Sequence, residues 1–358
     1  MKPVLAEVQN LLGRKVTFLE DCCGPKIERF CLDPEPGSVI LLENLRFHIE
    51  EEGEGFDVVK KQKFKADKFQ MEAFRKSLSN LGDIFVNDAI GVAHKKHSSI
   101  VGIDIDIKTC GLLMQKELDY FREALAEMYT PKPFLVIICG KSVGNNIECM
   151  KNLLDNRVTD MIIAGGMEYT FNKVLHGMEI GASVFDPEGE KLIPDLMAKA
   201  QERGVRIHLP CDFITAQEAS DEVNSITATI DSGILEGYHG LDIGFKTNEE
   251  FQGVVADAKT ILWYGVPGMY ELESFAFGSK QLMDGIVRAT RNGATSIISG
   301  GKTGMCAKKY NAMEHISHVS TANKEVIRIL LNGKALPGVK YLLNSMNGDK
   351  MENKSMKK

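Results

Sequence analysis

One stretch, residues 134–150, combines residue types that could bind a phosphate. It opens with the apolar run FLVII, whose length and β-branched residues predict a buried strand. Cys139 and Gly140 follow, and then Lys141, Ser142 and a pattern that predicts a helix. A strand, a small-residue turn and a helix leave free backbone N–H groups at the helix start, where a phosphate can bind. An ordinary βα turn without a ligand stays open as the alternative, because one glycine is far less specific than a full fingerprint.

The same strand–turn–helix pattern recurs through the second half of the chain. We predict short strands at 134–138, 161–163, 205–209, 261–264 and 296–298, and helices near 145–155, 190–203, 248–259, 279–291 and 324–332. Four of these five strands end beside a glycine, which favours a nucleotide site. Alternating β and α units predict an α/β fold with a doubly wound parallel sheet and ligands at the carboxyl ends of its strands.

A long predicted helix divides the chain into two. The length of 358 residues also predicts two domains, because single cores stop growing near ~250–300 residues. We predict a first domain over 1–114, a linking helix over 115–128, a second domain over 129–342 and a disordered, lysine-rich tail over 343–358. Buried-type strands at 38–42 and 83–87 indicate that the first domain is also an α/β unit, and the polar stretch after 87 is placed where such units hold ligands.

Composition excludes several classes of protein. The net charge of −6 argues against a nucleic-acid partner. No apolar run reaches 18 residues and no signal-peptide pattern opens the chain, so we predict no membrane segment. The eight cysteines are scattered, Cys22 and Cys23 are adjacent, and no pair has CxxC spacing. The sequence therefore predicts neither a zinc site nor a disulfide framework, and it favours a reducing, cytoplasmic compartment.

Several motifs occur in one order along the chain. They are SVILLENLRFH (38–48), GDIFVNDAIGVAHKKHSS (82–99), GLLMQKELDYF (111–121), MIIAGGMEYTFNKVL (161–175), MEIGASVFD (178–186), GLDIG (240–244), ELESFAFGSK (271–280) and HISHVST (315–321). Together they resemble phosphoglycerate kinase, the two-domain glycolytic enzyme that transfers a phosphoryl group between 1,3-bisphosphoglycerate and ADP. The resemblance implies two Rossmann-like domains, one for phosphoglycerate and one for the nucleotide.

The resemblance also implies site residues. On the first domain, Arg46 matches an arginine that grips the substrate phosphate, and Lys95 stands where the family has a second arginine. On the second domain, Glu271 matches a carboxylate that accepts ribose hydroxyls. The full set of implied nucleotide-binding residues is Gly140, Gly165, Gly166, Gly240, Leu241, Glu271, Gly300, Gly301 and Thr303. The alternative role for each glycine is packing. The alternative for Arg46 is an ordinary surface position.

Departures from the family fall on the chemistry. Ser142 and Asn146 replace two lysines that contact phosphates, and Lys302 stands at the family's metal-binding aspartate. An ammonium group repels Mg²⁺ and cannot bridge two phosphate oxygens as the metal does. We therefore expect ATP or ADP as the ligand, no metal site, and no intact catalytic residue among these positions.

No stretch of the sequence matches the family's opening segments, which include a catalytic arginine. We therefore expect a truncated, divergent copy with an incomplete first domain. One transition-state arginine is worth ~10³–10⁵ in the rate of phosphoryl transfer, and efficient turnover is therefore not expected. Three interpretations stay open: a working phosphoglycerate kinase, an inactive nucleotide- or partner-binding pseudoenzyme, and a degenerate copy without selected function. The family is typically monomeric, and the sequence leaves the oligomeric state open.

Overall fold

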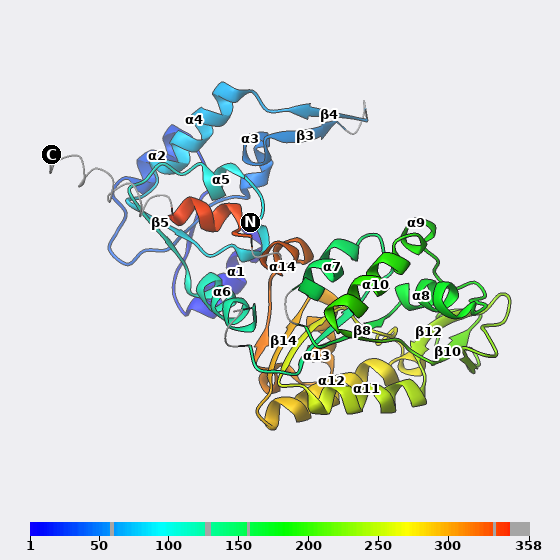
Figure 1. The fold of residues 1–358 in the computed structure, drawn as a ribbon. Helices are drawn as coiled ribbons and strands as arrows, with labels where there is room; N and C mark the ends of the chain where they lie inside the picture. Colours follow the sequence, from blue (N-terminus) through cyan, green and yellow to red (C-terminus); the bar gives the residue numbers. More distant parts are fainter. Residues whose placement is uncertain (58–60, 126–129, 156–157, 332–333, 344–358) are drawn as a thin grey trace, which may run out of the picture. The chain divides into compact units, whose positions relative to one another are not determined.

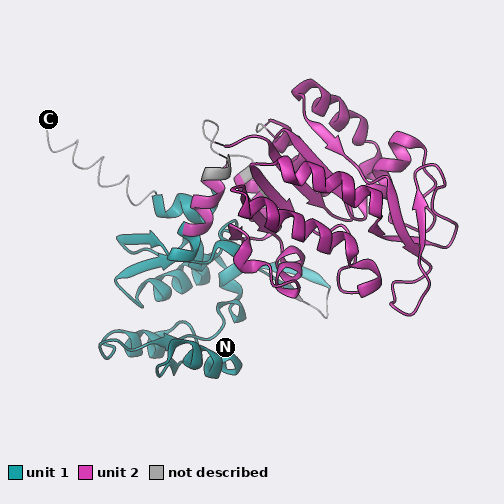
Figure 2. Cartoon of the chain, turned by 90° about the horizontal axis from the view of Figure 1, so that it is seen from below, with its two compact units in different colours: residues 1–115, 335–358 teal, residues 116–334 magenta. Residues whose placement is uncertain are grey.

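The chain forms two compact units. The computed structural model describes residues 1–57, 61–125, 130–155, 158–331 and 334–343. One unit comprises Met1–Gln115 with Ala335–Lys358, and the other comprises Lys116–Lys334 (Figure 2). The first division lies next to the boundary expected at 114/115. Residues 335–342 belong to the first unit, whereas the sequence analysis placed them in the second domain. Contacts explain this: Tyr341 donates a hydrogen bond to the carbonyl of Ile103 at 2.9 Å, and the amide of Gly338 donates to the carbonyl of Ala93.

A six-stranded, all-parallel sheet forms the centre of the second unit (Figure 1). In spatial order its strands are β15 (His318–Val319), β14 (Thr295–Ser299), β13 (Thr260–Tyr264), β7 (Phe134–Cys139), β8 (Asp160–Ala164) and β9 (Arg206–His208). The chain winds from β7 outward through β8 to β9, and then from β13 outward in the opposite direction. The strand order therefore reverses between β7 and β13, where α/β proteins bind ligands. The predicted doubly wound α/β fold is confirmed.

Helices cover both faces of this sheet, so its central strands are buried on both sides. All six residues of β7 are buried. Leu135 and Ile137 pack in one cluster with Phe251 of α11 and Met283 of α12, so the alternate residues of β7 face the other layer of helices. The helices of this unit are α7 (Ile147–Asp155), α8 (Met167–His176), α9 (Pro187–Glu190), α10 (Ile193–Arg203), α11 (Phe245–Asp257), α12 (Phe277–Arg291), α13 (Gly301–Lys309) and α14 (Lys324–Leu331), with the short 3-10 turns η4 (Glu273–Phe275) and η5 (Met313–His315).

A small antiparallel sheet, which the sequence analysis did not predict, adjoins the parallel one. Its order is β11 (Ile226–Thr229), β10 (Asp212–Ala216) and β12 (His239–Ile243). Phe213 and Ala228 of this sheet pack with Tyr169 of α8 and Ile234 in a separate apolar cluster. This packing places β12 beside the first turn of α8.

In the first unit, the described strands pair only in twos. The pairs are β1 (Thr17–Phe18) with β2 (Ile40–Leu41) and β5 (Ile84–Asn87) with β6 (Ile107–Cys110), both parallel, and the antiparallel hairpin β3 (Glu54–Asp57) with β4 (Gln62–Lys65). Ile84, Val86 and Ile107 are more than half exposed, so the β5–β6 pair has an uncovered apolar face among the described residues.

The helices of the first unit are mostly short. They are η1 (Lys2–Val4), α1 (Leu5–Leu12), α2 (Pro25–Cys31), η2 (Leu45–Phe47), α3 (Ile49–Glu52), α4 (Lys68–Ser79), η3 (Ile90–Val92), α5 (Ser98–Val101) and α6 (Leu112–Leu125). The longer ones are α4 and α6, and α6 continues into the second unit. The predicted linking helix corresponds to α6, and residues 126–128 of that prediction lie outside the described residues. Almost all of the predicted tail does so as well. Throughout the described chain, no helix combines the length and apolar character needed to cross a membrane.

Candidate functional site

The turns after four neighbouring parallel strands enclose one cavity in the second unit. Its volume is about 800 Å³, within the range of ~300–1,000 Å³ that small-molecule sites occupy. The strands β14, β13, β7 and β8 lie side by side, so their carboxyl ends bring their turns to one edge of the sheet. The cavity is lined by Cys139, Gly140 and Lys141 after β7, by Gly165 and Gly166 after β8, by residues 265–269 after β13, and by Gly300, Gly301, Lys302 and Thr303 after β14.

Sequence reasoning placed most of these residues at a nucleotide site, and the structure brings them together. Six of the nine come from these four turns and line the cavity, and β12 adds two more lining residues, Gly240 and Leu241. Glu271 does not line the cavity, but its carboxylate accepts a hydrogen bond from Lys302, which does. The set expected from the resemblance is therefore contiguous in space.

Two glycines allow close approaches here. Gly165 has φ +72°, a conformation that side-chain-bearing residues rarely adopt, and a Cβ at this position would lie 3.1 Å from the amide nitrogen of Gly140. A Cβ at Gly240 would overlap the hydroxyl group of Tyr169. At Gly165 two backbone segments therefore lie against each other, whereas at Gly240 the Tyr169 side chain packs against the backbone of β12.

The N-terminus of α13 offers an anion site at the edge of the cavity. Gly300 is the N-cap residue, and the helix begins at Gly301. The first amide groups of a helix have no partner within it, and the helix dipole adds positive potential. The hydroxyl of the buried Thr303 accepts a hydrogen bond from the amide of Gly265 at 2.8 Å, which fixes this turn to the one after β13. The arrangement is typical of phosphate-binding helix starts.

Lys302 introduces a cation at this same turn. Its ammonium group lies 3.1 Å from a carboxylate oxygen of Glu271, and both side chains are largely accessible to solvent. An exposed ion pair of this kind contributes at most about 1 kcal/mol to stability, so its effect is on the charge of the site. The pair neutralises Glu271 and places a positive charge beside the α13 amides.

Ser142 and Asn146 do not line the cavity. The Ser142 hydroxyl donates to Asp186 at 2.7 Å, and the same carboxylate oxygen accepts from the amide of Gly144. The Asn146 side chain is buried and donates to the carbonyl of Ser142 at 2.8 Å. Both residues therefore stabilise the turn after β7, whereas Lys141 lines the cavity.

The sequence analysis did not identify several residues of the cavity wall. Tyr169, Ser183, His239 and Glu218 line the cavity from α8, from the segment after it, from β12 and from the loop after β10. These residues come from the antiparallel sheet and its neighbours. The motif MEYTFNKVL contains Tyr169, but nothing local shows that it packs against Gly240.

Two acidic groups are buried in the wall behind the cavity. Glu168, directly before Tyr169, is fully buried, and this burial raises the pKa of its carboxyl well above the usual value. Burial also raises the pKa of Asp242 in β12 to about 7, although the amides of Gly278 and Ile243 donate to it. The burial therefore favours the protonated, uncharged form of Glu168.

The two residues expected to bind phosphoglycerate lie in the first unit. The Arg46 side chain is 54% exposed and lies 3.1 Å from a carboxylate oxygen of Glu52. Lys95 is exposed and follows η3, where its amide donates to the carbonyl of Val92. Both side chains are accessible to a ligand.

Comparisons with known proteins agree with the fold and the cavity. The family model described as "Phosphoglycerate kinase" matches residues 1–334. The phosphoglycerate kinase of Aplysia californica is 56% identical over 342 residues, which are 96% of this chain and 82% of that protein. Phosphoglycerate kinase 2 of Homo sapiens is 51% identical over 344 residues, covering 96% of this chain and 81% of the relative.

Solved structures give the same result. The phosphoglycerate kinase from Coxiella burnetii superposes with a TM-score of 0.78 at 30% identity, over 96% of this chain and 80% of that chain. The enzyme from Pyrococcus horikoshii OT3 superposes with a TM-score of 0.77 at 23% identity, over 97% and 82% of the two chains, and supports the fold. With a family model that matches nearly the whole described chain and relatives above 50% identity, this chain belongs to the phosphoglycerate kinase family.

Proposed function

We propose that this chain binds an adenine nucleotide, ATP or ADP, in the cavity of the second unit, without efficient phosphoryl transfer. The family reaction is the transfer of a phosphoryl group between ATP and 3-phosphoglycerate. The cavity volume, the glycine-lined wall and the N-terminus of α13 all support nucleotide binding. The observation that carries the second half of the proposal is the position of Lys302 beside Glu271.

The residues at the phosphate turn do not fit a magnesium ion. Mg²⁺ is held by carboxylates and phosphate oxygens in near-octahedral geometry. Here the turn after β14 presents an ammonium group, which is paired with Glu271 at 3.1 Å. Among the described residues that line the cavity, Glu218 is the only one with a carboxylate, and it comes from the loop after β10. We therefore derive no step through a metal.

The charges that remain are suited to binding. The α13 amides and Lys302 can neutralise part of the charge on a nucleotide phosphate. Phosphoryl transfer depends on charge neutralisation spread over the transferring group and the leaving oxygen. The ammonium groups of the two lining lysines, Lys141 and Lys302, cannot bridge phosphate oxygens as a metal ion does. Ser142 and Asn146 contribute hydrogen bonds to their own turn and no charge to the cavity. These charges therefore support nucleotide binding without phosphoryl transfer.

We extend the proposal to phosphoglycerate binding on the first unit. Arg46 and Lys95 are exposed cations, and a guanidinium group suits a planar, two-bond contact with a phosphate. Arg46 is paired with Glu52, so a phosphate must compete with an exposed carboxylate. Such surface pairs are weak, and the dianionic phosphate should displace Glu52.

A paired measurement tests the proposal. ADP binding to the purified chain is measured by equilibrium dialysis in the presence of EDTA, and ATP-dependent phosphorylation of 3-phosphoglycerate is measured beside the Aplysia californica relative. We expect ADP binding together with a transfer rate at least ~10³-fold below that of the relative, since one lost charge-stabilising group costs about this much. A rate within tenfold of the relative would show a working kinase. A folded sample that binds no ADP would remove the nucleotide function.

A further inference from the structure

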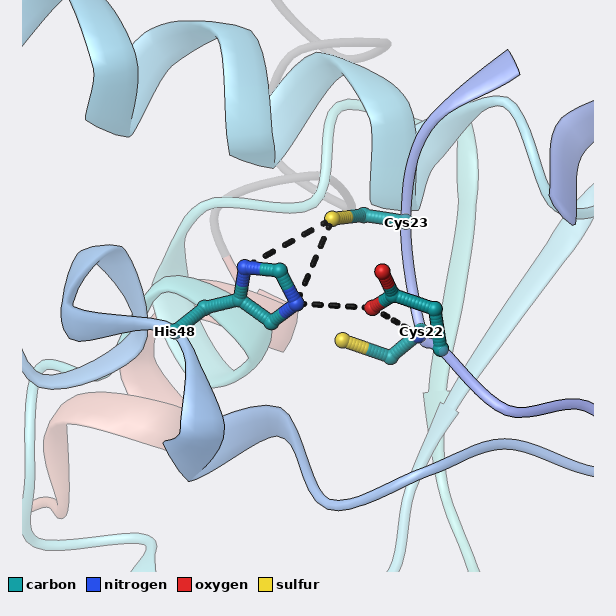
Figure 3. Close-up of side chains that lie close together, drawn as sticks. Cys22, Cys23 and His48 are labelled. Carbon is teal, nitrogen blue, oxygen red and sulfur yellow. Dashed lines mark hydrogen bonds and ion pairs between the residues drawn. The ribbon is translucent and has the colours of Figure 1, made fainter. Parts of the chain in front are cut away.

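A group of metal-ligand side chains lies in the first unit, outside the sites described above. Asp21, Cys22, Cys23 and His48 place one carboxylate oxygen, two sulfurs and one imidazole nitrogen within 4.8 Å of one another (Figure 3). We call these four residues the thiol–imidazole cluster. Figure 3 shows the His48 ring directed at the Cys22–Cys23 loop.

The fold brings the cluster together at the carboxyl edge of two paired strands. β1 and β2 are parallel, with Thr17 opposite Ile40 and Phe18 opposite Leu41. The loop after β1 carries the two cysteines, and the segment after β2 leads through η2 to His48, which is the N-cap residue of α3. Both chain segments therefore leave the sheet at the same edge, which is where parallel α/β sheets place ligand-binding side chains.

The distances are close to those of a tetrahedral zinc site. Zinc bonds of about 2.0–2.3 Å separate neighbouring ligand atoms by roughly 3.3–3.8 Å in a tetrahedron. The Cys23 sulfur lies 3.8 Å from Nε2 of His48 and 3.9 Å from Nδ1. His48 Nε2 lies 2.7 Å from Asp21 Oδ1, and the widest pair in the cluster reaches 4.8 Å. Side-chain shifts of about 1 Å or less would bring all four ligand atoms to a common centre.

The surroundings favour a bound cation with desolvated ligands. Cys22 is fully buried, and it packs in an apolar cluster with Phe74, Leu78 and Ile103. The rings of His48 and Phe74 lie 5.3 Å apart, so α4 closes one side. The opposite side is open to solvent at Asp21, whose side chain is 51% exposed. A metal ion has an entry path here and an apolar floor below it.

The charge of the cluster depends on whether a cation is present. Burial raises the pKa of the Cys22 thiol to about 12, with further contributions from Cys23 and Asp21, and it raises the pKa of the Cys23 thiol as well. Partial burial disfavours the Asp21 carboxylate, but the hydrogen bonds from His48 and from the backbone of Cys22 and Cys23 together outweigh it and lower its pKa. A metal ion supplies the positive charge that two thiolates require.

We propose that the thiol–imidazole cluster binds one zinc ion through Cys22, Cys23, His48 and Asp21. Sulfur and imidazole ligands select zinc over Mg²⁺ or Ca²⁺, and four protein ligands form the closed set of a structural site. Zinc displaces the two thiol protons, the His48 ring binds through one nitrogen and keeps its N–H on the other, and no oxidation or reduction is involved. The ion links the β1–α2 loop to the segment that carries Arg46, two residues before His48.

Protection from alkylation tests the site on the unaltered chain. The reduced protein is treated with N-ethylmaleimide in the presence of Zn²⁺ or EDTA and then digested with trypsin. Cys22 and Cys23 fall in the peptide 16–26, and Cys31 alone falls in the peptide 30–46. We expect zinc to slow labelling of the first peptide at least tenfold and to leave the second unchanged. Equal labelling of peptide 16–26 in the presence of zinc and of EDTA overturns the proposal. A disulfide between Cys22 and Cys23 that persists after reduction also overturns it.

Cobalt binding provides a second test. Co²⁺ in a tetrahedral site with sulfur ligands gives intense visible absorption and a thiolate charge-transfer band. We expect one Co²⁺ per chain, displaced by Zn²⁺, and at least a tenfold loss of affinity in Cys23→Ser and in His48→Asn. The matched control Cys31→Ser, in the same unit but outside the cluster, should bind as the original chain does. Unchanged affinity in both cluster variants, or an octahedral spectrum, contradicts the proposed ligands.

Discussion

The cavity of the second unit and the thiol–imidazole cluster of the first occupy equivalent places in their sheets. They differ in that backbone forms much of the cavity wall, whereas side chains form the cluster. Each lies at the carboxyl ends of paired parallel strands. The cavity is lined largely by backbone, at glycines such as Gly165 and Gly240 where no Cβ fits. The cluster consists of side chains, with Cys23 and His48 facing each other at 3.8 Å.

This difference determines how each site responds to substitution. A backbone-lined cavity tolerates changes of the charged residues at its rim, because its shape is set by strand ends and φ angles. Lys302 is such a residue, since it changes the charge of the cavity without changing its wall. A side-chain site depends on each ligand. Substitutions should therefore abolish nucleotide binding at the glycines and alter only its ionic requirements at Lys302.

The largest effect is expected for Gly165→Val. At φ +72° a β-branched residue is strained by about 1–2 kcal/mol or more, and its side chain would press on the Gly140 turn at 3.1 Å. ADP affinity measured by calorimetry should fall at least about 100-fold. Gly253→Val in α11 is the control, because a Cβ there meets open space. Near-normal ADP binding by Gly165→Val would mean that the cavity is not the nucleotide site.

Lys302→Asp tests whether the charge at the rim of the cavity sets the ionic requirement of nucleotide binding. Replacing the cation by a carboxylate creates a ligand for Mg²⁺ beside the α13 amides. ADP affinity in this variant should rise about tenfold or more when Mg²⁺ replaces EDTA. Lys308→Asp, an exposed change in the last turn of the same helix, controls for charge alone. An identical Mg²⁺ response in the two variants would indicate that position 302 does not face the phosphates.

Arg46→Met tests the side-chain character of the first unit. A hydrogen bond to a charged group contributes about 1.5–3 kcal/mol, so 3-phosphoglycerate affinity should fall roughly tenfold or more. The unfolding free energy should change by less than about 1 kcal/mol, because the Arg46–Glu52 pair is exposed. Arg29→Met, an exposed substitution on α2, serves as the control. If both variants bind 3-phosphoglycerate equally well, Arg46 is an ordinary surface residue.

Glu168→Gln is expected to have the smallest effect, on the pH dependence of stability. The folded protein raises the pKa of Glu168, so this residue contributes stability that is complete below its unfolded pKa, near ~4.3, and that is lost as pH rises through the folded pKa. The unfolding free energy of the chain should therefore decrease from about pH 5 towards pH 9, with Asp242, at a pKa of about 7, acting in the same direction.

The variant should remove part of this slope, because it removes the titrating carboxyl. Urea denaturation at a series of pH values measures it, with the exposed Glu188→Gln as control. A slope that is unchanged in Glu168→Gln would show that this carboxyl does not titrate in the folded protein.

The parallel sheet of the second unit could be predicted because its signals are local. Each strand is a short apolar run, and four of them lead into glycine-containing turns that also form the cavity. The sheet β11–β10–β12 could not be predicted in this way. Its pairings join distant segments, such as Phe213 with Ile243, and a register shift between Ile214 and Thr215 interrupts the pattern.

Charged and ligand-forming side chains were harder to place than strands. The partners Lys302 and Glu271 are 31 residues apart, and Cys23 and His48 are 25 residues apart. Adjacent cysteines match no spaced zinc motif, so the sequence predicted no metal site there. Glu168 has the sequence position of an ordinary acidic residue in a first helical turn, and its burial follows only from tertiary packing.

Calorimetric titration of the unaltered chain with ADP, in Mg²⁺ and in EDTA, tests the central claim most directly. The claim is that the cavity retains a nucleotide site that binds ADP without a metal ion. The account predicts binding in both buffers, with dissociation constants that agree within about twofold. Affinity that rises tenfold or more with Mg²⁺, or the absence of binding by folded protein in both buffers, would contradict it.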